Sequence, residues 1–283
     1  MNVILGYLFF FIAASASPLQ RRWLASAKNH ENKGQVRFAF QVMTIVSVLG
    51  LLIPFFQPAH IEGSPLSLIG LSVCAGIFGA GFFISSFVAQ KHVDAGVTSL
   101  ISNLYTPVTI ILASLLLGEG LMPMQAFGTM LLLAGVLIVS KKHRTGRFSF
   151  DRYFLLMALS GISLGICLTA ERALQKMTGF SAGTLLSWWS QSAFLGLTTL
   201  AYREKGPYSA IDISVTGILR FLQSLSWVIL IFVVGNLSIV SSITTFKVVI
   251  VFVFAALFLG ERDDIRRKII GSLVAVAGLL MMK

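Results

Sequence analysis

The strongest constraint in the sequence is a series of ten apolar stretches, each 17 to 24 residues long, that recur along the 283 residues of the chain. A bilayer core of about 30 Å is crossed by roughly 20 residues of α-helix. In lipid, a segment must satisfy its backbone polar groups internally, as an α-helix does. The sequence therefore predicts an all-α membrane protein of ten transmembrane helices. The predicted helices cover residues 2–20, 36–56, 66–89, 95–117, 123–140, 152–171, 181–201, 213–234, 238–259 and 266–282.

Composition agrees with lipid as the solvent of the chain. Hydrophobic residues make up 56% and charged residues only 12%, with a mean hydropathy of +0.86. A soluble domain is about 25% charged. The net charge of +11 comes from short basic clusters between apolar stretches. Because these clusters form no stripe along a polar face, we expect a lipid bilayer and no nucleic acid as the partner of the chain.

The basic residues also predict how the helices are oriented. Of the 22 Lys and Arg residues, 17 fall in or beside the loops after the first, third, fifth, seventh and ninth predicted helices. Cytoplasmic loops carry an excess of such residues, so both termini are predicted outside. Residues 3–16 lack the preceding positive charge of a signal peptide and are predicted to stay as the first helix. We expect a multi-pass protein of the cell (inner) membrane.

The two halves of the chain carry matching segments. The sequence LLLGE at residues 115–119 matches LFLGE at residues 257–261, and each precedes an apolar helix with two glycines seven residues apart. The glycines are Gly128 and Gly135 in one half and Gly271 and Gly278 in the other. Small residues at this spacing let membrane helices approach closely. The predicted units are a five-helix repeat at 1–140, a basic connecting loop at 141–151 and a second five-helix repeat at 152–283.

Five helices is an odd number, so the second repeat must enter the membrane from the opposite side to the first. Two inverted repeats are typical of secondary transporters, whose substrate site lies at the midplane between the halves. At this point the sequence resembles the EamA-like transporter family of the drug/metabolite transporter superfamily. The resemblance is carried by AGVTSL at 95–100, Pro107-Val108 and Gly118-Glu119, and by Ile239, Thr245-Phe246-Lys247 and Gly260-Glu261.

The resemblance covers the whole chain and implies two five-helix inverted repeats around a central cavity. It implies a secondary transporter that moves a small metabolite by alternating access, as an exporter, and no enzyme activity. A flippase for a lipid-linked amphiphile is the alternative, since its head group would pass through the same cavity. We expect a small-molecule solute as the ligand of a monomer or homodimer.

Lys247 is the sharpest candidate for a functional residue, because it lies near the centre of the predicted helix 238–259. A charge at the bilayer centre costs about 2.5–3.5 kcal/mol on insertion scales. Thirteen residues, roughly 20 Å of helix, separate Lys247 from Gly260, which is too far for the side chain to reach the interface. We expect Lys247 to face a cavity and bind a carboxylate or phosphate. A structural ion pair or hydrogen bond is the alternative.

Other polar or aromatic residues lie at a depth in the predicted helices similar to that of Lys247. Tyr105 is its counterpart in the first repeat, and Pro107 can kink the helix beside it. Arg220 and Gln223 share a helix face. We expect such residues to outline a cavity wall, with packing or interhelical hydrogen bonding as the alternative for each. The candidates are Asn103, Tyr105, Trp188, Gln191, Arg220, Gln223, Trp227 and Lys247.

Acidic residues are expected only in loops or at the ends of the predicted helices. An exporter of organic cations would be expected to use an intramembrane carboxylate, so the sequence favours an anionic or zwitterionic solute. A membrane enzyme would need a base or paired carboxylates near a nucleophile, and none falls inside a predicted helix. The histidines lack metal-ligand spacing, and the two cysteines lie in apolar stretches, so no metal site, cofactor or disulfide is predicted.

Overall fold

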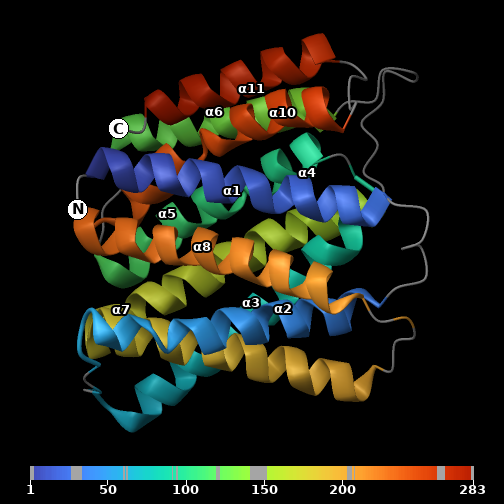
Figure 1. The fold of residues 1–283 in the computed structure, drawn as a ribbon. Helices are drawn as coiled ribbons and strands as arrows, with labels where there is room; N and C mark the ends of the chain where they lie inside the picture. The colour runs from blue at the N-terminus through green and yellow to red at the C-terminus, as the bar shows by residue number, and fades with distance from the viewer. Residues whose placement is uncertain are drawn as a thin grey trace.

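The computed structural model describes residues 3–26, 34–59, 61, 63–90, 92–93, 95–118, 122–140, 152–202, 206, 208–259 and 265–281. Within these ranges the chain is all-α, with most helices running roughly along one direction (Figure 1). The helices are α1 (Val3–Ser26), α2 (Gln35–Gly50), the 3-10 turn η2 (Ile53–Phe55), α3 (Pro65–Ala89), α4 (Ala95–Ser102), α5 (Tyr105–Leu117), α6 (Pro123–Ser140), α7 (Arg152–Ala201), α8 (Ala210–Val234), α9 (Leu237–Thr244), α10 (Lys247–Phe258) and α11 (Ile265–Leu280).

Six helical segments of the described ranges are long and apolar enough to cross a membrane. They are Gln35–Phe55, Pro65–Ala89, Ala95–Leu117, Arg152–Ala201, Ala210–Val234 and Leu237–Ala255. The helices α1, α6 and α11 coincide with three further predicted stretches. Large apolar side chains such as Leu115, Leu200 and Phe258 are at least 75% exposed. A surface of this kind suits lipid, and the chain is a multi-pass membrane protein.

The helix α7 contains two of the predicted helices, 152–171 and 181–201, in 50 residues. They are separated by Gly179, whose backbone angles of φ 79° and ψ 168° are open to almost no other residue. Gln175 Nε2 donates to Thr184 Oγ1 at 3.0 Å, so the two arms of α7 lie side by side. The predicted helix end at residue 171 is therefore wrong. The charged residues that follow lower the hydropathy, but they do not interrupt the helix.

Two of the predicted helices, 95–117 and 238–259, are broken near their middles. The break between α4 and α5 follows from Pro107, which has no N–H to donate to the carbonyl of Asn103. That carbonyl instead accepts from Thr106 N at 2.9 Å. The break between α9 and α10 contains no proline, and short-range bonds such as Val248 N to Thr245 O at 3.0 Å tighten it. The two breaks are 142 residues apart in the sequence.

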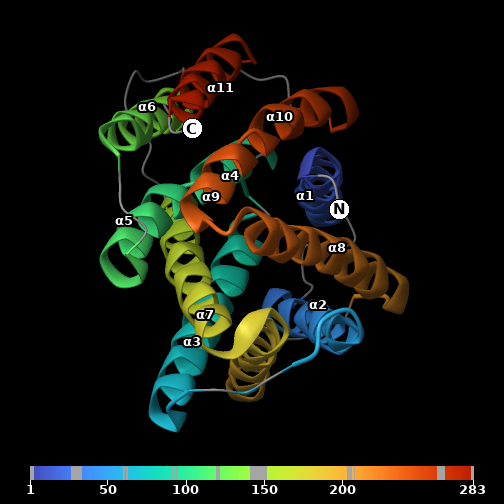
Figure 2. The same ribbon diagram turned by 90° about the vertical axis from the view of Figure 1, so that its left-hand side faces the viewer.

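The helices α6 and α11 pack closely together at one side of the molecule (Figures 1 and 2). A Cβ atom at Gly135 would lie 2.5 Å from the carbonyl oxygen of Gly271. A Cβ atom at Gly278 would lie 2.5 Å from the carbonyl oxygen of Gly128. The four glycines of the matching segments thus pair reciprocally across one antiparallel contact. The predicted close approach at these glycines is confirmed.

One further prediction needs correction, and others lie beyond the structure. The helix α1 continues past residue 20 to Ser26, and Arg21 is a buried helical residue, only 2% exposed, instead of a loop residue. Its sequence position after an apolar stretch did not reveal this, because Arg21 lies on the face that packs against other helices. The basic connecting loop 141–151, the acidic residue Glu119 and the segment Gly260-Glu261 lie outside the described residues.

Candidate functional site

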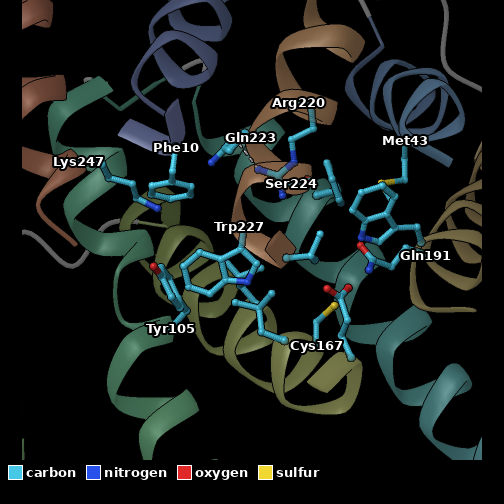
Figure 3. A pocket seen from close by; sticks show the side chains of 16 residues that line it. Phe10, Met43, Tyr105, Cys167, Gln191, Arg220, Gln223, Ser224, Trp227 and Lys247 are labelled. Carbon is cyan, nitrogen blue, oxygen red and sulfur yellow. Dashed lines mark hydrogen bonds between the residues drawn. The ribbon is translucent and has the colours of Figure 1, made fainter. Parts of the chain in front are cut away.

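A cavity of about 60 Å³ lies among α1, α2, α3, α5, α7, α8 and α10; we call it the central cavity (Figure 3). It brings together side chains that are far apart in the sequence. Seven of the eight candidate residues line it: Tyr105, Trp188, Gln191, Arg220, Gln223, Trp227 and Lys247. The remaining candidate, Asn103, lines neither this cavity nor the second one described below. It is fully buried at the break between α4 and α5, and its amide atoms have no hydrogen-bond partner among the described residues.

Lys247 is the first residue of α10 and extends into the central cavity beside aromatic rings (Figure 3). Its Nζ lies 5.1 Å from the ring centroid of Tyr105 and 6.0 Å from that of Phe10. Trp227 packs against both rings, with centroid distances of 5.8 and 5.7 Å. Cation–π contacts contribute about 0.5–2 kcal/mol, more where water is excluded. The aromatic rings thus offset part of the cost of holding an ammonium group within the membrane.

Arg220 extends from α8 into the same cavity. Its Nη1 donates to Gln223 Oε1 at 3.1 Å, and its guanidinium lies 4.8 Å from the ring centroid of Phe83. The Nε of Arg220 and the indole Nε1 of Trp227 are buried, and neither donates a hydrogen bond to any described residue. A buried donor without a partner costs about 1–3 kcal/mol. The wall of the cavity therefore presents donors that an acceptor group on a ligand could satisfy.

Glu171 is a functional candidate that the sequence did not predict. It lies within α7, is only 3% exposed and lines the central cavity. Ser187 Oγ donates to Glu171 Oε2 at 2.6 Å, and Gln191 Nε2 donates to Ser187 Oγ at 2.9 Å. Glu171 also interacts electrostatically with Arg220. The expectation that no acidic residue lies inside the membrane helices is wrong at Glu171.

A helical pattern in the sequence could have identified Glu171. It follows Leu164 by seven residues and Cys167 by four, and all three residues line the central cavity. Residues at these spacings share one face of a helix. Because the predicted helix ends at residue 171, the prediction places Glu171 at a helix end and not on this face.

A second cavity of about 80 Å³ lies next to the central cavity, among α1, α3, α4, α7, α8 and α10. The two cavities share four lining residues: Leu164, Arg220, Gln223 and Lys247. Arg21 of α1 and Gln90, which follows α3, line only the second cavity. The second cavity is therefore nearer to the end of the molecule where α1 leads into α2.

An all-α chain with an apolar exterior and a charged cavity between its helices has the architecture of a membrane transport protein. The model of the EamA-like transporter family matches residues 1–141. Residues 1–141 therefore belong to this family of the drug/metabolite transporter superfamily, whose members are transporters and not enzymes. The predicted resemblance is confirmed over those residues.

A protein of known crystal structure has a similar fold. The similarity covers 99% of this chain and 96% of that one, with a TM-score of 0.68 and 14% sequence identity. At this identity the likeness concerns the fold alone. No curated protein matches the chain.

Proposed function

We propose that this protein is a secondary transporter that exports a small zwitterionic or anionic metabolite across the cell membrane by alternating access. The observation that carries the proposal is the charge pattern of the central cavity. Lys247 and Arg220 are cations, Glu171 is an acid, and all three line one cavity. A solute with both a carboxylate and an ammonium group would find a complementary partner for each.

The unpartnered donors of the cavity support the same proposal. Arg220 Nε and Trp227 Nε1 are buried and available to a carboxylate or phosphate oxygen, whereas Glu171 already accepts from Ser187. Among the described residues that line the cavity, the buried polar atoms without a partner are both donors. The anionic group of the solute is therefore expected to bind between Lys247 and Arg220. The presence of Glu171 in the cavity favours a zwitterion over a simple anion as the solute.

We also propose that the chain is built from ten transmembrane helices in two inverted repeats, at 1–140 and 152–283. Three observations support this arrangement. The breaks in α4–α5 and α9–α10 are 142 residues apart, and so are Tyr105 and Lys247, the first residues after each break. The glycines of α6 and α11 pair reciprocally. Broken helices beside the substrate site are typical of transporters with inverted repeats.

Binding to purified protein tests the assignment of the site. We would titrate amino acids, organic acids, sugar phosphates and cationic dyes against the protein in detergent and measure its thermal stability, because a ligand that prefers the folded state stabilises it by mass action. The variant Lys247→Met keeps most of the side-chain length and removes the charge. We expect its affinity for a stabilising solute to fall about tenfold or more, as when a buried charged partner is removed.

The matched control is Lys176→Met, because Lys176 is an exposed residue of α7 that lines neither cavity. The control should bind the solute as the unmodified protein does. Counterflow of the same solute in proteoliposomes then measures transport. Stabilisation by cationic dyes alone, or a binding solute indifferent to Lys247→Met, would contradict the proposed site. Movement of a labelled lipid in place of a soluble solute would favour the flippase.

A further inference from the structure

The second cavity has a charge pattern unlike that of the central cavity. Three cationic side chains line it, from three different helices: Arg21 of α1, Arg220 of α8 and Lys247 of α10. No acidic residue is among the described residues that line it. Like charges that share a small cavity repel one another, and the repulsion grows as water is excluded. The cavity is therefore built to hold negative charge.

The guanidinium of Arg21 is held in place by two aromatic rings and an amide oxygen. Its guanidinium lies 3.5 Å from the ring centroid of Phe87 and 4.8 Å from that of Phe38, and its Nη2 donates to Gln35 Oε1 at 3.3 Å. Gln35 Nε2 in turn donates to the hydroxyl of Tyr208 at 2.7 Å. These contacts fix the plane of the guanidinium. Its orientation therefore does not have to be established when a ligand binds.

The guanidinium of Arg21 also interacts with Tyr208, but two of its nitrogens have no hydrogen-bond partner among the described residues. Its Nε and Nη1 are fully buried and donate to none of the described residues, although the side chain is only 2% exposed. These two nitrogens carry three of the five N–H groups of a guanidinium. An unsatisfied buried charge of this kind costs several kcal/mol unless a partner of opposite charge is available. The side chain lines the second cavity, so a partner bound there would be within its reach.

The rest of the wall supplies neutral groups suited to an oxyanion. Hydroxyl groups from α1, α3, α4 and α8 line the cavity, and each carries one O–H donor. Those of Ser86, Thr98, Ser102 and Thr216 already donate to backbone carbonyls, so Ser17 and Ser99 are the hydroxyl groups best placed to donate to a ligand. The amide oxygen of Gln90 is buried there with no partner among the described residues, so it could accept from a protonated oxygen of the ligand.

We propose that the second cavity is a separate oxyanion-binding site, with Arg21 as its anchor, that binds the carboxylate or phosphate of a solute or of a lipid head group. This proposal rests on the proposed function only through Arg220 and Lys247, which line both cavities. Arg21 belongs to the second cavity alone and Glu171 to the central cavity alone. The two sites can therefore be tested separately.

Purified protein in neutral detergent tests the site, with thermal stability measured against inorganic phosphate or sulfate at constant ionic strength. We expect saturable stabilisation of the unmodified protein. In Arg21→Met the affinity for phosphate should fall about tenfold or more, because a charge-assisted partner is lost. Arg21→Lys keeps the positive charge but not the planar guanidinium, so it should bind phosphate with intermediate affinity. This variant also tests the site if Arg21→Met does not fold.

Two control variants separate this site from its surroundings. Arg266→Met removes an exposed charge from α11, which lines neither cavity, and should leave phosphate binding unchanged. Glu171→Gln should retain phosphate binding while it impairs binding of a zwitterion. If phosphate binding depends on Arg21 and neither a zwitterionic nor an anionic metabolite binds in the central cavity, the oxyanion site stands and the proposed function fails.

The same assay with lipids in place of phosphate distinguishes a lipid head group from a free anion as the ligand. Short-chain phosphatidylglycerol is compared with phosphatidylcholine, and stabilisation by the former alone, lost in Arg21→Met, would assign the site to a head group. Stabilisation by soluble phosphate, lost in the same variant, would assign it to a free anion. Stabilisation by no anion, or stabilisation that is equal in Arg21→Met and the unmodified protein, would overturn the proposal.

Discussion

The contact between α6 and α11 gives a prediction whose size can be worked from the structure. In Gly135→Ala the added Cβ would lie 2.5 Å from the carbonyl oxygen of Gly271 and 2.8 Å from the Cβ of Ala275. Ordinary contact begins at 3.4 Å, so the two helices would have to move apart by about 0.9 Å. The obstacle at Gly271 is backbone, which cannot rotate away as the end of a side chain can.

Overpacking of this kind costs about 1–3 kcal/mol, and a rigid backbone obstacle places the cost at the upper end. The same substitution stabilises the helix by about 1 kcal/mol, because the helix propensity of alanine exceeds that of glycine. We expect a net loss of about 2 kcal/mol, which corresponds to a fall in melting temperature of about 4–8 °C for a protein of this size. The reciprocal variant Gly278→Ala should lose about the same, because its Cβ meets Gly128 at an equal distance.

The assay is thermal unfolding of the purified protein in detergent, followed by the fluorescence of its tryptophans. The control is Gly70→Ala in α3, because no atom lies within 4 Å of a Cβ built at that exposed position. The control should be neutral or slightly more stable. Equal stability of Gly135→Ala and the unmodified protein would refute the close helix contact. Unequal losses at Gly135 and Gly278 would count against the reciprocal packing.

Two further predictions concern α7. Gly179→Ala forces an L-residue into a conformation that is essentially open only to glycine, so unfolding should become easier by about 1–3 kcal/mol in the same thermal assay, and unchanged stability would contradict the reversal at Gly179. Glu171→Gln removes the acid of the central cavity, so affinity for an amino acid should fall about tenfold while affinity for the matching carboxylate without an amine is retained, as measured by ligand stabilisation. Equal losses for both ligands would show that Glu171 has a structural role.

Much of the fold follows from physics that is visible in the sequence. The apolar stretches and the glycines of α6 and α11 identified a multi-pass chain with two closely packed helices, because lipid requires length and apolar surface above all. The position of Lys247 beside a cavity was predictable, because a charge in the middle of the membrane is costly unless it has a partner or a polar cavity. The helix breaks before Tyr105 and Lys247 were harder to predict from the sequence, because only the first has a proline near it.

The missed residues share one physical cause. Glu171 and Arg21 both lie where a charge lowers the local hydropathy, and low hydropathy does not by itself mark the end of a helix. A helix ends where its backbone geometry changes. In α7 this occurs at Gly179, eight residues after Glu171, and α1 is still helical at Ser26, five residues after Arg21. The tertiary contact of Ser187 with Glu171 satisfies that carboxylate, and no local sequence pattern records such a contact.

The three charged side chains of the central cavity also determine how the membrane potential acts on transport. Lys247, Arg220 and Glu171 together carry a formal net charge of about +1, so the cavity suits a monovalent anion or a zwitterion. The two kinds of solute differ in the charge that they carry across the membrane. A zwitterion carries no net charge, and its passage generates no current. A monovalent anion leaving a cell that is negative inside gains about 2.3 kcal/mol for each 100 mV. Under the proposed function, the net charge of the solute that this cavity binds therefore sets whether export draws on the membrane potential or depends on the concentration gradient alone.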